Sequence, residues 1–422
     1  KGGDKPDVRY ILADKFFTDV IDSGHGLRGE IDQGNNHMGE WLLGLTFGQW
    51  AAFYEFTLAH VDRAARKRAG QYFTPDDVAA MMATKAVAHF GQHETALKKL
   101  SASNLNHHHQ TGGDDNSNKK IWCDPAAGIG NLAYYLIAAQ TQPEIFLRDN
   151  IFFIDRDPLA LFIGRVLLTV AFQRQQKNLF HDIESKFITA DFLTHPNLPY
   201  FDYALFNPPY GQLRQNDKLW QQSAFATKSA GDLYACFMER VMERAVGFVA
   251  ITPQSFTHAA KFFSLRTLLL TSGKNIFIYN FDNVPDNIFR GRKFGSDNSN
   301  RVNSIRAAIT IFHKNSESKN SKQATVSFVI TPLLRWRAAE RARLFDSIDI
   351  FLTPLPLHDM GAAIFPKCPR GLDNLYQQSL SWPRLASLLA PKPTRYFLAV
   401  PTTPRYFISA MKTHPRRTSY RL

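Results

Sequence analysis

The sequence is poor in cysteine, has no long uncharged apolar run and has fewer acidic than basic residues. Its three cysteines, Cys123, Cys236 and Cys368, lie far apart, so they form no disulfide framework and no zinc-binding spacing. We therefore expect free thiols in a reducing, cytoplasmic environment. No stretch of about 18 uncharged apolar residues exists, so we expect no membrane-spanning helix. The opening "KGGDKPDVRY" lacks the charged-then-apolar pattern of a signal peptide, and its lack of Met fits a missing natural N-terminus.

The deficit of acidic residues is strongest at the C-terminal end. The chain has 50 Lys and Arg against 37 Asp and Glu, a net charge of +13 with a pI of about 9.6. Residues 331–422 alone contain 14 Lys and Arg against 5 Asp and Glu, a net charge of +9. Such a gathering of positive charge favours a polyanionic partner. The alternative is a solvated basic face with no partner.

The length of 422 residues predicts two or three domains. Residues 1–69 have apolar residues at helical spacing and predict an N-terminal helical region. Residues 70–330 form the next domain, and a rise in Pro and Arg near residue 330 predicts a boundary before a C-terminal basic domain, 331–422. The polar segment 101–120 contains three adjacent histidines. We predict no metal site there, because no Cys or acidic ligand recurs at metal-binding spacing.

The central domain alternates strand-like and helix-like segments. The predicted strands are 120–123, the end of 144–155, 187–193 including its exit, 201–206, 246–252, 275–281 and 307–313. This alternation predicts an α/β fold, a Rossmann-like, doubly wound and mainly parallel sheet with helices on both faces. Upstream, "TPDD" (74–77) predicts a helix start, with Thr74 as the N-cap, Pro75 at the first position and acids in the first turn.

Polar or small residues follow four of these strands. The segments are "DPAAGIG" (124–130), "DRD" (155–157), Asp191 with Phe192, and "NPPY" (207–210). Because ligands bind at the carboxyl ends of strands in such sheets, we expect these residues to share one site. The small residues of the first segment let an adenosyl ligand approach the backbone, and a helix N-terminus offers amides. Asp155 is placed to accept from ribose hydroxyls and Asp191 from an amine.

The segment "FDYALFNPPYG" (201–211) requires an explanation of its own. Two adjacent prolines fix two φ angles and remove two backbone donors, and the first disfavours helical geometry at Asn207. A stiff loop is therefore expected after the strand. The Asn207 side-chain oxygen and the Pro208 carbonyl can both accept hydrogen bonds from an exocyclic amine, and Tyr210 can stack on a planar base. Rigid acceptors favour reaction because they need little reorganisation.

Taken in order, "GQYFTP" (70–75), "DPAAGIG", "FIDRDP" (153–158), "ADFL" (190–193) and "NPPY" resemble the adenine-N6 DNA methyltransferases of the γ motif order. That group includes type I modification subunits and fused restriction–modification enzymes, and the resemblance covers roughly residues 65–315. It implies S-adenosylmethionine as the cofactor, double-stranded DNA as the partner, a flipped-out adenine as the target and a setting in restriction–modification or phage defence. It also implies a specificity or nuclease subunit as a possible further partner.

The resemblance also implies residue roles. Cofactor contacts are implied for Tyr72, Phe73, Thr74, Asp124, Pro125, Ala126, Gly128, Asp155, Asp191 and Phe192. The implied catalytic residues are Asn207, Pro208, Pro209 and Tyr210. Tyr210 and Phe289 are the implied stacking rings for the target base, with a core role for Phe289 as the alternative. No metal is implied, and residues 331–422 are expected to form all or part of a target-recognition domain.

Two other functions stay open at this point. A protein-glutamine N5-methyltransferase uses the same NPPY chemistry, because a side-chain amide nitrogen is similarly delocalised. The basic segment 331–422 argues against a protein-glutamine methyltransferase. The second open function is a DNA-binding subunit with degenerate chemistry. The intact NPPY segment argues against this function. The short "DIESK" (182–186) contains a nuclease-like E-x-K pattern, but we interpret it as a surface stretch.

Overall fold

The computed structural model describes most of the chain between residues 74 and 381. The described ranges are 74–91, 120–174, 178–290, 305–315, 326–355 and 364–381, together with Phe47, Trp50 and three short strands near the C-terminus. The expected helical region 1–69, apart from Phe47 and Trp50, and the His-containing segment before residue 120 lie outside these residues. The chain divides into two compact units, Lys1–Arg370 and Gly371–Leu422.

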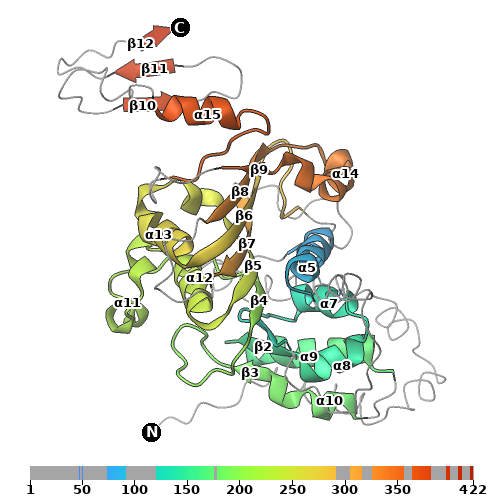
Figure 1. The fold of residues 1–422 in the computed structure, drawn as a ribbon. Helices are drawn as coiled ribbons and strands as arrows, with labels where there is room; N and C mark the ends of the chain where they lie inside the picture. The colour runs from blue at the N-terminus through green and yellow to red at the C-terminus, as the bar shows by residue number, and fades with distance from the viewer. Residues whose placement is uncertain are drawn as a thin grey trace, which may run out of the picture. The chain divides into compact units, whose positions relative to one another are not determined.

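The first unit is built on one nine-stranded sheet (Figure 1). Its strands are β1 (Trp122–Asp124), β2 (Ile151–Asp155), β3 (Phe187–Thr189), β4 (Tyr203–Phe206), β5 (Gly247–Pro253), β6 (Gly273–Phe281), β7 (Ala307–Lys314), β8 (Ser327–Leu334) and β9 (Thr353–Pro354), in the spatial order β3-β2-β1-β4-β5-β7-β6-β8-β9. Strands β1 to β5 are mutually parallel, β6 and β8 pair in parallel, and β7 and β9 run antiparallel to their neighbours. The mainly parallel α/β sheet expected from the sequence is confirmed.

Helices cover both faces of this sheet. They are α5 (Asp76–Phe90), α7 (Asn131–Ala138), α8 (Pro143–Asp149), α9 (Pro158–Phe172), α10 (Leu179–Asp182), α11 (Lys218–Gln222), α12 (Leu233–Arg244), α13 (Phe263–Ser272) and α14 (Arg341–Asp346). Short 3-10 turns are η2 (Glu184–Lys186), η3 (Ala226–Ala230), η4 (Gln254–Thr257), η5 (Ala260–Phe262), η6 (Ala338–Glu340) and η7 (Ile348–Phe351). Figure 1 shows α5 and α7 on one side of the sheet and α12 and α13 on the other. None of the described helices is long and apolar enough to cross a membrane.

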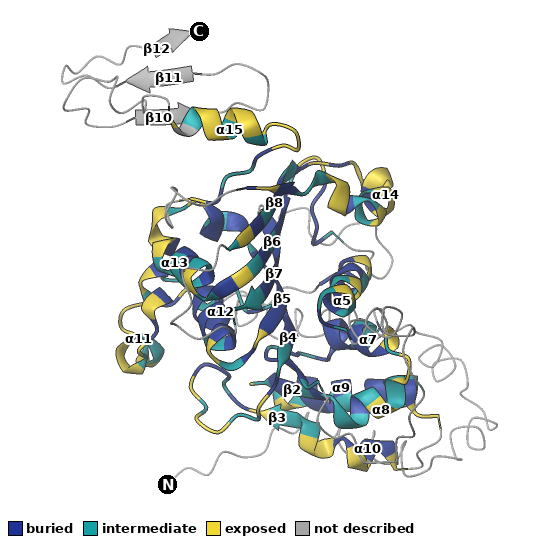
Figure 2. Cartoon of the chain, viewed as in Figure 1, coloured by how far each residue is buried: buried dark blue, intermediate teal, exposed yellow. Residues whose placement is uncertain are grey.

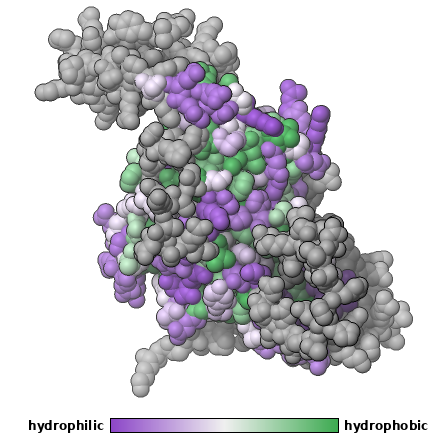
Figure 3. Space-filling model, viewed as in Figure 1, coloured by the Kyte–Doolittle hydropathy of each residue, from purple (hydrophilic) through white to green (hydrophobic). Residues whose placement is uncertain are grey.

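The core follows from the apolar strands. Strands β5 and β7 are buried along almost their whole length, as Figure 2 shows by their dark colour. Helix α9 illustrates the local signals: Asp157 caps it by accepting from the backbone N–H groups of Leu159 and Ala160, and Pro158 occupies its first position. The outer surface mixes apolar and hydrophilic side chains, and hydrophilic ones gather around α14 in Figure 3.

The domain boundary expected at residue 330 falls inside β8, so the first unit extends to Arg370 instead. Pro332 made this segment look unlike a strand, because proline cannot donate to a sheet. The sheet accommodates it with a register shift between Ile278 and Asn280 of β6. There Asn280 bonds Thr331 twice, its backbone N–H to the hydroxyl at 2.8 Å and its side-chain amide to the carbonyl at 2.9 Å.

The second unit is described by itself. It contains α15 (Asp373–Leu380) and a three-stranded antiparallel sheet of β10 (Tyr396–Ala399), β11 (Phe407–Ala410) and β12 (Ser419–Arg421). Its expected role in target recognition stays a prediction.

Candidate active site

The loop after β1 takes a conformation that only glycine adopts freely. Gly128 and Gly130 have φ angles of +53° and +83°, in the left-handed region. At Gly128, no atom of the described residues lies within 4 Å of the position that a Cβ would take, whereas at Gly130 a Cβ would meet Leu168 at 3.2 Å. The loop is therefore closed against α9 on one side and open on the other. The open side fits the close approach of a ligand to the backbone.

Asp155, at the end of β2, fixes this loop. One carboxylate oxygen accepts from the Gly128 N–H at 2.8 Å, and the other accepts from the Asp157 N–H at 3.0 Å. Burial raises the pKa of Asp155, and these two backbone donors act against that rise. The residue expected to bind ribose thus already shapes the glycine loop. Its role in cofactor binding stays a prediction.

Asp124 lies at the start of the same loop and is almost fully buried. Burial raises its pKa to about 8, although the Ala126 N–H donates to it at 3.2 Å. At neutral pH the group is therefore largely protonated and can donate as well as accept a hydrogen bond. Pro125 beside it is buried, and Ala126 is half-buried.

Asp191 and Phe192, after β3, have different surroundings. Asp191 is half-buried and accepts from the Leu193 N–H at 3.0 Å and from Arg156 at 3.4 Å. Phe192 is 1% exposed, and its ring stacks on Phe237 with the ring centres 5.4 Å apart. Asp191 therefore lies at the open edge of the sheet, while the Phe192 ring packs in the core. The expected contact of Phe192 with a cofactor adenine stays a prediction.

The NPPY loop follows β4 and is tied to Thr74. The Asn207 side-chain amide donates to the Thr74 hydroxyl at 2.9 Å, across 133 residues of sequence. The expectation that Thr74 caps the following helix is wrong: α5 starts after Pro75 and has no side-chain cap. The Thr74 carbonyl accepts from the Asn131 amide at 2.8 Å. Thr74 therefore joins Asn131, the first residue of α7 next to the glycine loop, to Asn207 of the NPPY loop.

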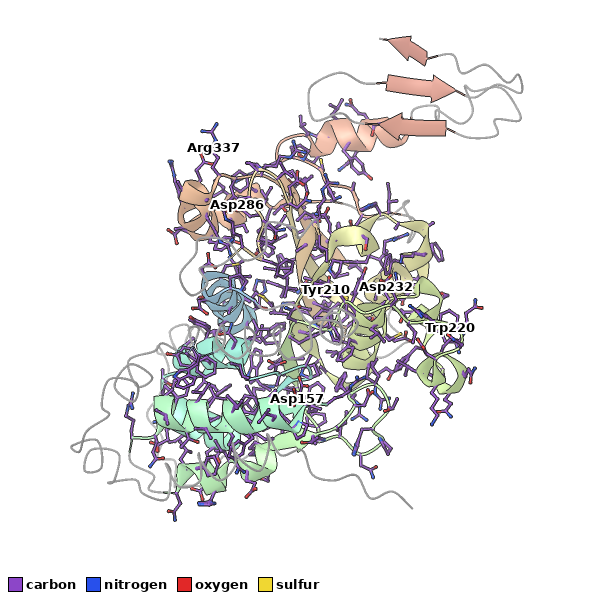
Figure 4. The ribbon with its side chains drawn as sticks, turned by 180° about the vertical axis from the view of Figure 1, so that it is seen from behind. Asp157, Tyr210, Trp220, Asp232, Asp286 and Arg337 are labelled. Atoms are coloured by element: carbon purple, nitrogen blue, oxygen red, sulfur yellow. The ribbon has the colours of Figure 1, made fainter. Side chains whose placement is uncertain are left out.

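The two rings expected to hold the target base lie close together. The Tyr210 and Phe289 ring centres are 6.0 Å apart with an interplanar angle of 66°, an edge-on arrangement. Tyr210 is half-buried and its hydroxyl donates to the Ile251 carbonyl at 3.2 Å, whereas Phe289 is 1% exposed. In Figure 4, Tyr210 lies in the middle of the first unit, between Asp157 after β2 and Asp286 in the segment that follows β6.

Arg341 is a residue of this region that sequence reasoning missed. It is buried, and its guanidinium forms two hydrogen bonds to the Asp77 carboxylate in α5, one of them of 2.9 Å. It also donates to the carbonyls of Asn287 and Ile288 at 2.9 and 2.7 Å. Arg341 thus links the helix that follows Thr74 to the segment that carries Phe289. No local signal could have revealed it, because Arg341 and Asp77 are 264 residues apart.

Two expected cofactor residues, Tyr72 and Phe73, lie outside the described residues. Within the ranges that the structure covers, no group of three or more His, Cys, Asp or Glu side chains is arranged to hold a metal ion.

Residues 149–289, which run from β2 through the NPPY loop to Phe289, match the family described as "Eco57I restriction-modification methylase". No curated protein matches the chain.

Three solved structures are similar to the chain at low sequence identity. The DrdV–DNA complex is 13% identical with a TM-score of 0.51, covering 78% of this chain and 34% of that chain. The ATP-dependent type ISP restriction-modification enzyme LlaBIII bound to DNA is 14% identical with a TM-score of 0.49, covering 75% and 24%. The type I restriction-modification methyltransferase subunit from Streptococcus thermophilus is 14% identical with a TM-score of 0.43, covering 73% and 60%. The chain thus spans about a third or less of the first two proteins.

Proposed function

We propose that the protein transfers a methyl group from S-adenosylmethionine to the exocyclic N6 of an adenine flipped out of double-stranded DNA, as part of a restriction–modification system. The observation that carries the proposal is the Asn207 amide, held by Thr74 beside Tyr210 inside the segment that matches a methylase family. The DrdV–DNA complex supports the fold. Partners such as a specificity or nuclease subunit belong to the same proposal.

The chemistry begins with a weak nucleophile. The lone pair of adenine N6 is delocalised into the ring, so it must be localised before it can attack. Asn207 donates from its amide nitrogen to Thr74, and its amide oxygen is the group that we propose as the acceptor for the amine. The Pro208 carbonyl is a second acceptor, fixed by the adjacent proline rings. Two preorganised acceptors favour a tetrahedral nitrogen without reorganisation during the reaction.

The residues that we propose to contact the cofactor lie at the carboxyl ends of the strands. The open side of Gly128 would admit the adenosyl group, with Asp155, Asp191 and Asp124 as hydrogen-bonding partners. S-adenosylmethionine supplies a methyl group that is already activated by a positive sulfonium, so a strong general base is unnecessary. The proton released from N6 is left to solvent, because neither Asn207 nor Pro208 titrates.

Removal of the base from the duplex costs a few kcal/mol and needs stacking partners to offset it. Tyr210, half-buried and next to Phe289, is the side chain proposed for that contact.

The test is methyl transfer to mixed-sequence DNA by the full chain, followed by digestion to nucleosides and mass spectrometry. We expect N6-methyladenine, formed by the wild type and absent with Asn207→Ala. Long-read sequencing of the same DNA would give the sequence context. Methylcytosine in place of N6-methyladenine would overturn the substrate assignment. Methylation of a protein glutamine with unmodified DNA would instead favour the glutamine methyltransferase.

A further inference from the structure

A buried carboxylate at the end of β6 holds two arginines. The Asp282 side chain is 1% exposed; one oxygen accepts from Arg306 Nε at 2.7 Å and the other from Arg335 Nε. The Asn283 N–H also donates to Asp282 at 2.9 Å. Burial alone would raise the pKa of Asp282, but the hydrogen bonds from the arginines and Asn283 hold it below its usual value. The carboxylate is therefore ionised and fixes both guanidinium groups in place.

Both arginines reach solvent from this anchor. Their side chains are 53% and 63% exposed, and each uses Nε for Asp282. Within the described part of the chain, the terminal Nη groups of Arg306 and Arg335 make no hydrogen bond. An arginine bound through one edge keeps further N–H donors for a second anion. The pair is thus preorganised to receive one.

A third cation adds to this cluster. Lys367 is half-buried, and burial together with the charge of Arg306 lowers its pKa to about 8. The segment that carries it is fixed to the turn after β5, because the Phe365 N–H donates to the Thr257 carbonyl at 2.6 Å. Lys367 therefore lies near the ion pairs that Asp282 forms with the two arginines.

The cluster lies on the same edge of the sheet as the proposed base pocket. Asp282 follows β6 and Arg335 follows β8, which are parallel strands. Arg306 precedes the antiparallel β7, and its carbonyl accepts from the Gln254 N–H at 2.8 Å, directly after β5. The segment that begins at Asp282 contains Asp286, labelled above Tyr210 in Figure 4, and reaches Phe289.

We propose that Arg306, Arg335 and Lys367 bind a backbone phosphate of DNA beside the extruded nucleotide. The proposal deepens the function proposed above and rests on it for the nature of the nucleotide. Planar guanidinium groups suit phosphate because two N–H donors can meet two oxygens. A phosphate held here would fix the strand while Tyr210 and Phe289 receive the base, a division of labour in which phosphate contacts position the protein on the duplex.

The test is the salt dependence of binding to a short fluorescent duplex of mixed sequence, measured by anisotropy with the full chain. The triple variant Asp282→Asn, Arg306→Gln, Arg335→Gln removes the anchor together with both arginines, so no buried charge is left unpaired. Its slope of log K against log salt should be shallower by about 1.8, which is two contacts at about 0.9 each. Lys367→Gln breaks no described ion pair and should reduce the slope by about 0.9.

The matched control is Arg174→Gln with Lys274→Gln. Arg174 is the second residue after α9 and Lys274 is the second residue of β6, so both lie toward the opposite edge of the sheet, and both are exposed. The control loses more net charge than the triple variant but should keep the wild-type slope. Unchanged slopes in both test variants, or an equal loss in the control, would overturn the phosphate site.

Two further readouts separate the possible failures. Calorimetric titration with S-adenosylmethionine shows whether the triple variant is folded; if it is not, Lys367→Gln decides. Methyl transfer by the wild type is measured in parallel. Absent methylation with the expected slopes would reject the proposed function and keep the anion site, whereas methylation with unchanged slopes would do the reverse.

Discussion

The two halves of the candidate site are held in different ways. On the cofactor side, the bonds are local: Asp124 accepts from Ala126 two residues on, and Asp155 accepts from Gly128 within one strand–helix–strand unit. On the target side, they are distant: Asn207 bonds Thr74 across 133 residues and Arg341 bonds Asp77 across 264. A local loop forms with its sheet, whereas the target side is complete only when distant segments have met. Damage to the target side should therefore leave cofactor binding largely intact.

Asn207→Ala is expected to give the largest difference between the effect on methyl transfer and the effect on cofactor binding. The loss of a preorganised acceptor should reduce methyl transfer by at least about a hundredfold, or about 2.7 kcal/mol. Affinity for S-adenosylmethionine, measured by calorimetry, should stay within a few-fold of wild type. Asn150→Ala is the control, because Asn150 is half-buried and precedes β2, at the opposite end of the strands. Activity above about a tenth of wild type would reject the role of Asn207.

Arg341→Gln should act on the target side without touching a reacting atom. It removes the link between α5 and the carbonyls before Phe289, so the base pocket should lose its geometry. Because a misplacement of 1 Å can cost about a hundredfold, we expect methyl transfer to fall by about ten- to a hundredfold. The affinity for S-adenosylmethionine should stay the same as in the wild type.

The pattern of rescue tests this positioning role. Arg341→Lys should not restore activity, because one ammonium cannot span the carboxylate and two carbonyls. Arg343→Gln removes an exposed arginine from the same helix and should behave as wild type. Equal losses in Arg341→Gln and Arg343→Gln would show that charge alone matters.

The converse variants are Asp155→Ala and Asp191→Ala. Each removes an acceptor at the cofactor side, so affinity for S-adenosylmethionine should weaken by about 1–3 kcal/mol. At saturating cofactor the transfer rate should change less than in Asn207→Ala. Asp182→Ala, an exposed acid in α10, is the control. If both test variants bind the cofactor normally, the strand-end interpretation of the pocket is wrong.

The smallest effect concerns the anchoring of α5 to the sheet. His89 of α5 lies 3.1 Å from His313 of β7, ring nitrogen to ring nitrogen, and both pKa values are lowered, chiefly by burial. Lys85 lowers the pKa of His89 further, and Asp349 raises it. For His313 the pKa falls from 6.5 to about 4. A lowered histidine pKa means that the unfolded chain binds more protons, so stability is lost as the pH falls.

We therefore expect the urea midpoint of unfolding to decrease between pH 6.5 and about 4. His313→Gln should flatten this dependence, while His89 and His258, whose pKa values are also lowered, should supply the part that remains. An identical pH profile for the wild type and His313→Gln would show that the pair does not report on the anchoring of α5.

The same division explains what could be predicted from the sequence. Strand-end reasoning placed Asp124, Asp155, Asp191 and Asn207 at one edge of the sheet, because parallel strands bring their carboxyl ends together whatever the rest of the chain does. Their roles stay predictions. It gave Thr74 the ordinary role of a helix cap, since its true partner is fixed by tertiary contact. Arg341 and Asp282 had no signal at all: an isolated Arg or Asp looks alike on a surface and in a buried ion pair.

The boundary at residue 330 failed for a related reason. Pro332 and the nearby arginines looked like a change of domain, because local composition does not show that Asn280 bonds Thr331 across the sheet. The arginines that made the segment look separate include Arg335 and Arg341, whose partners Asp282 and Asp77 are in the preceding part of the same unit.

The segment between the NPPY loop and α12 begins and ends at the same place in the structure. The Leu233 N–H donates to the Gly211 carbonyl at 2.9 Å, and the Leu213 N–H donates to the Gly231 carbonyl at 3.0 Å. Its length is therefore not set by the elements that it connects, and in Figure 4 its residue Trp220 lies well away from Tyr210. For a protein engineer, the exposed Asn216 is an insertion point for a tag or a binding peptide. In evolution, the same stretch can lengthen and acquire new contacts without a change in the NPPY loop.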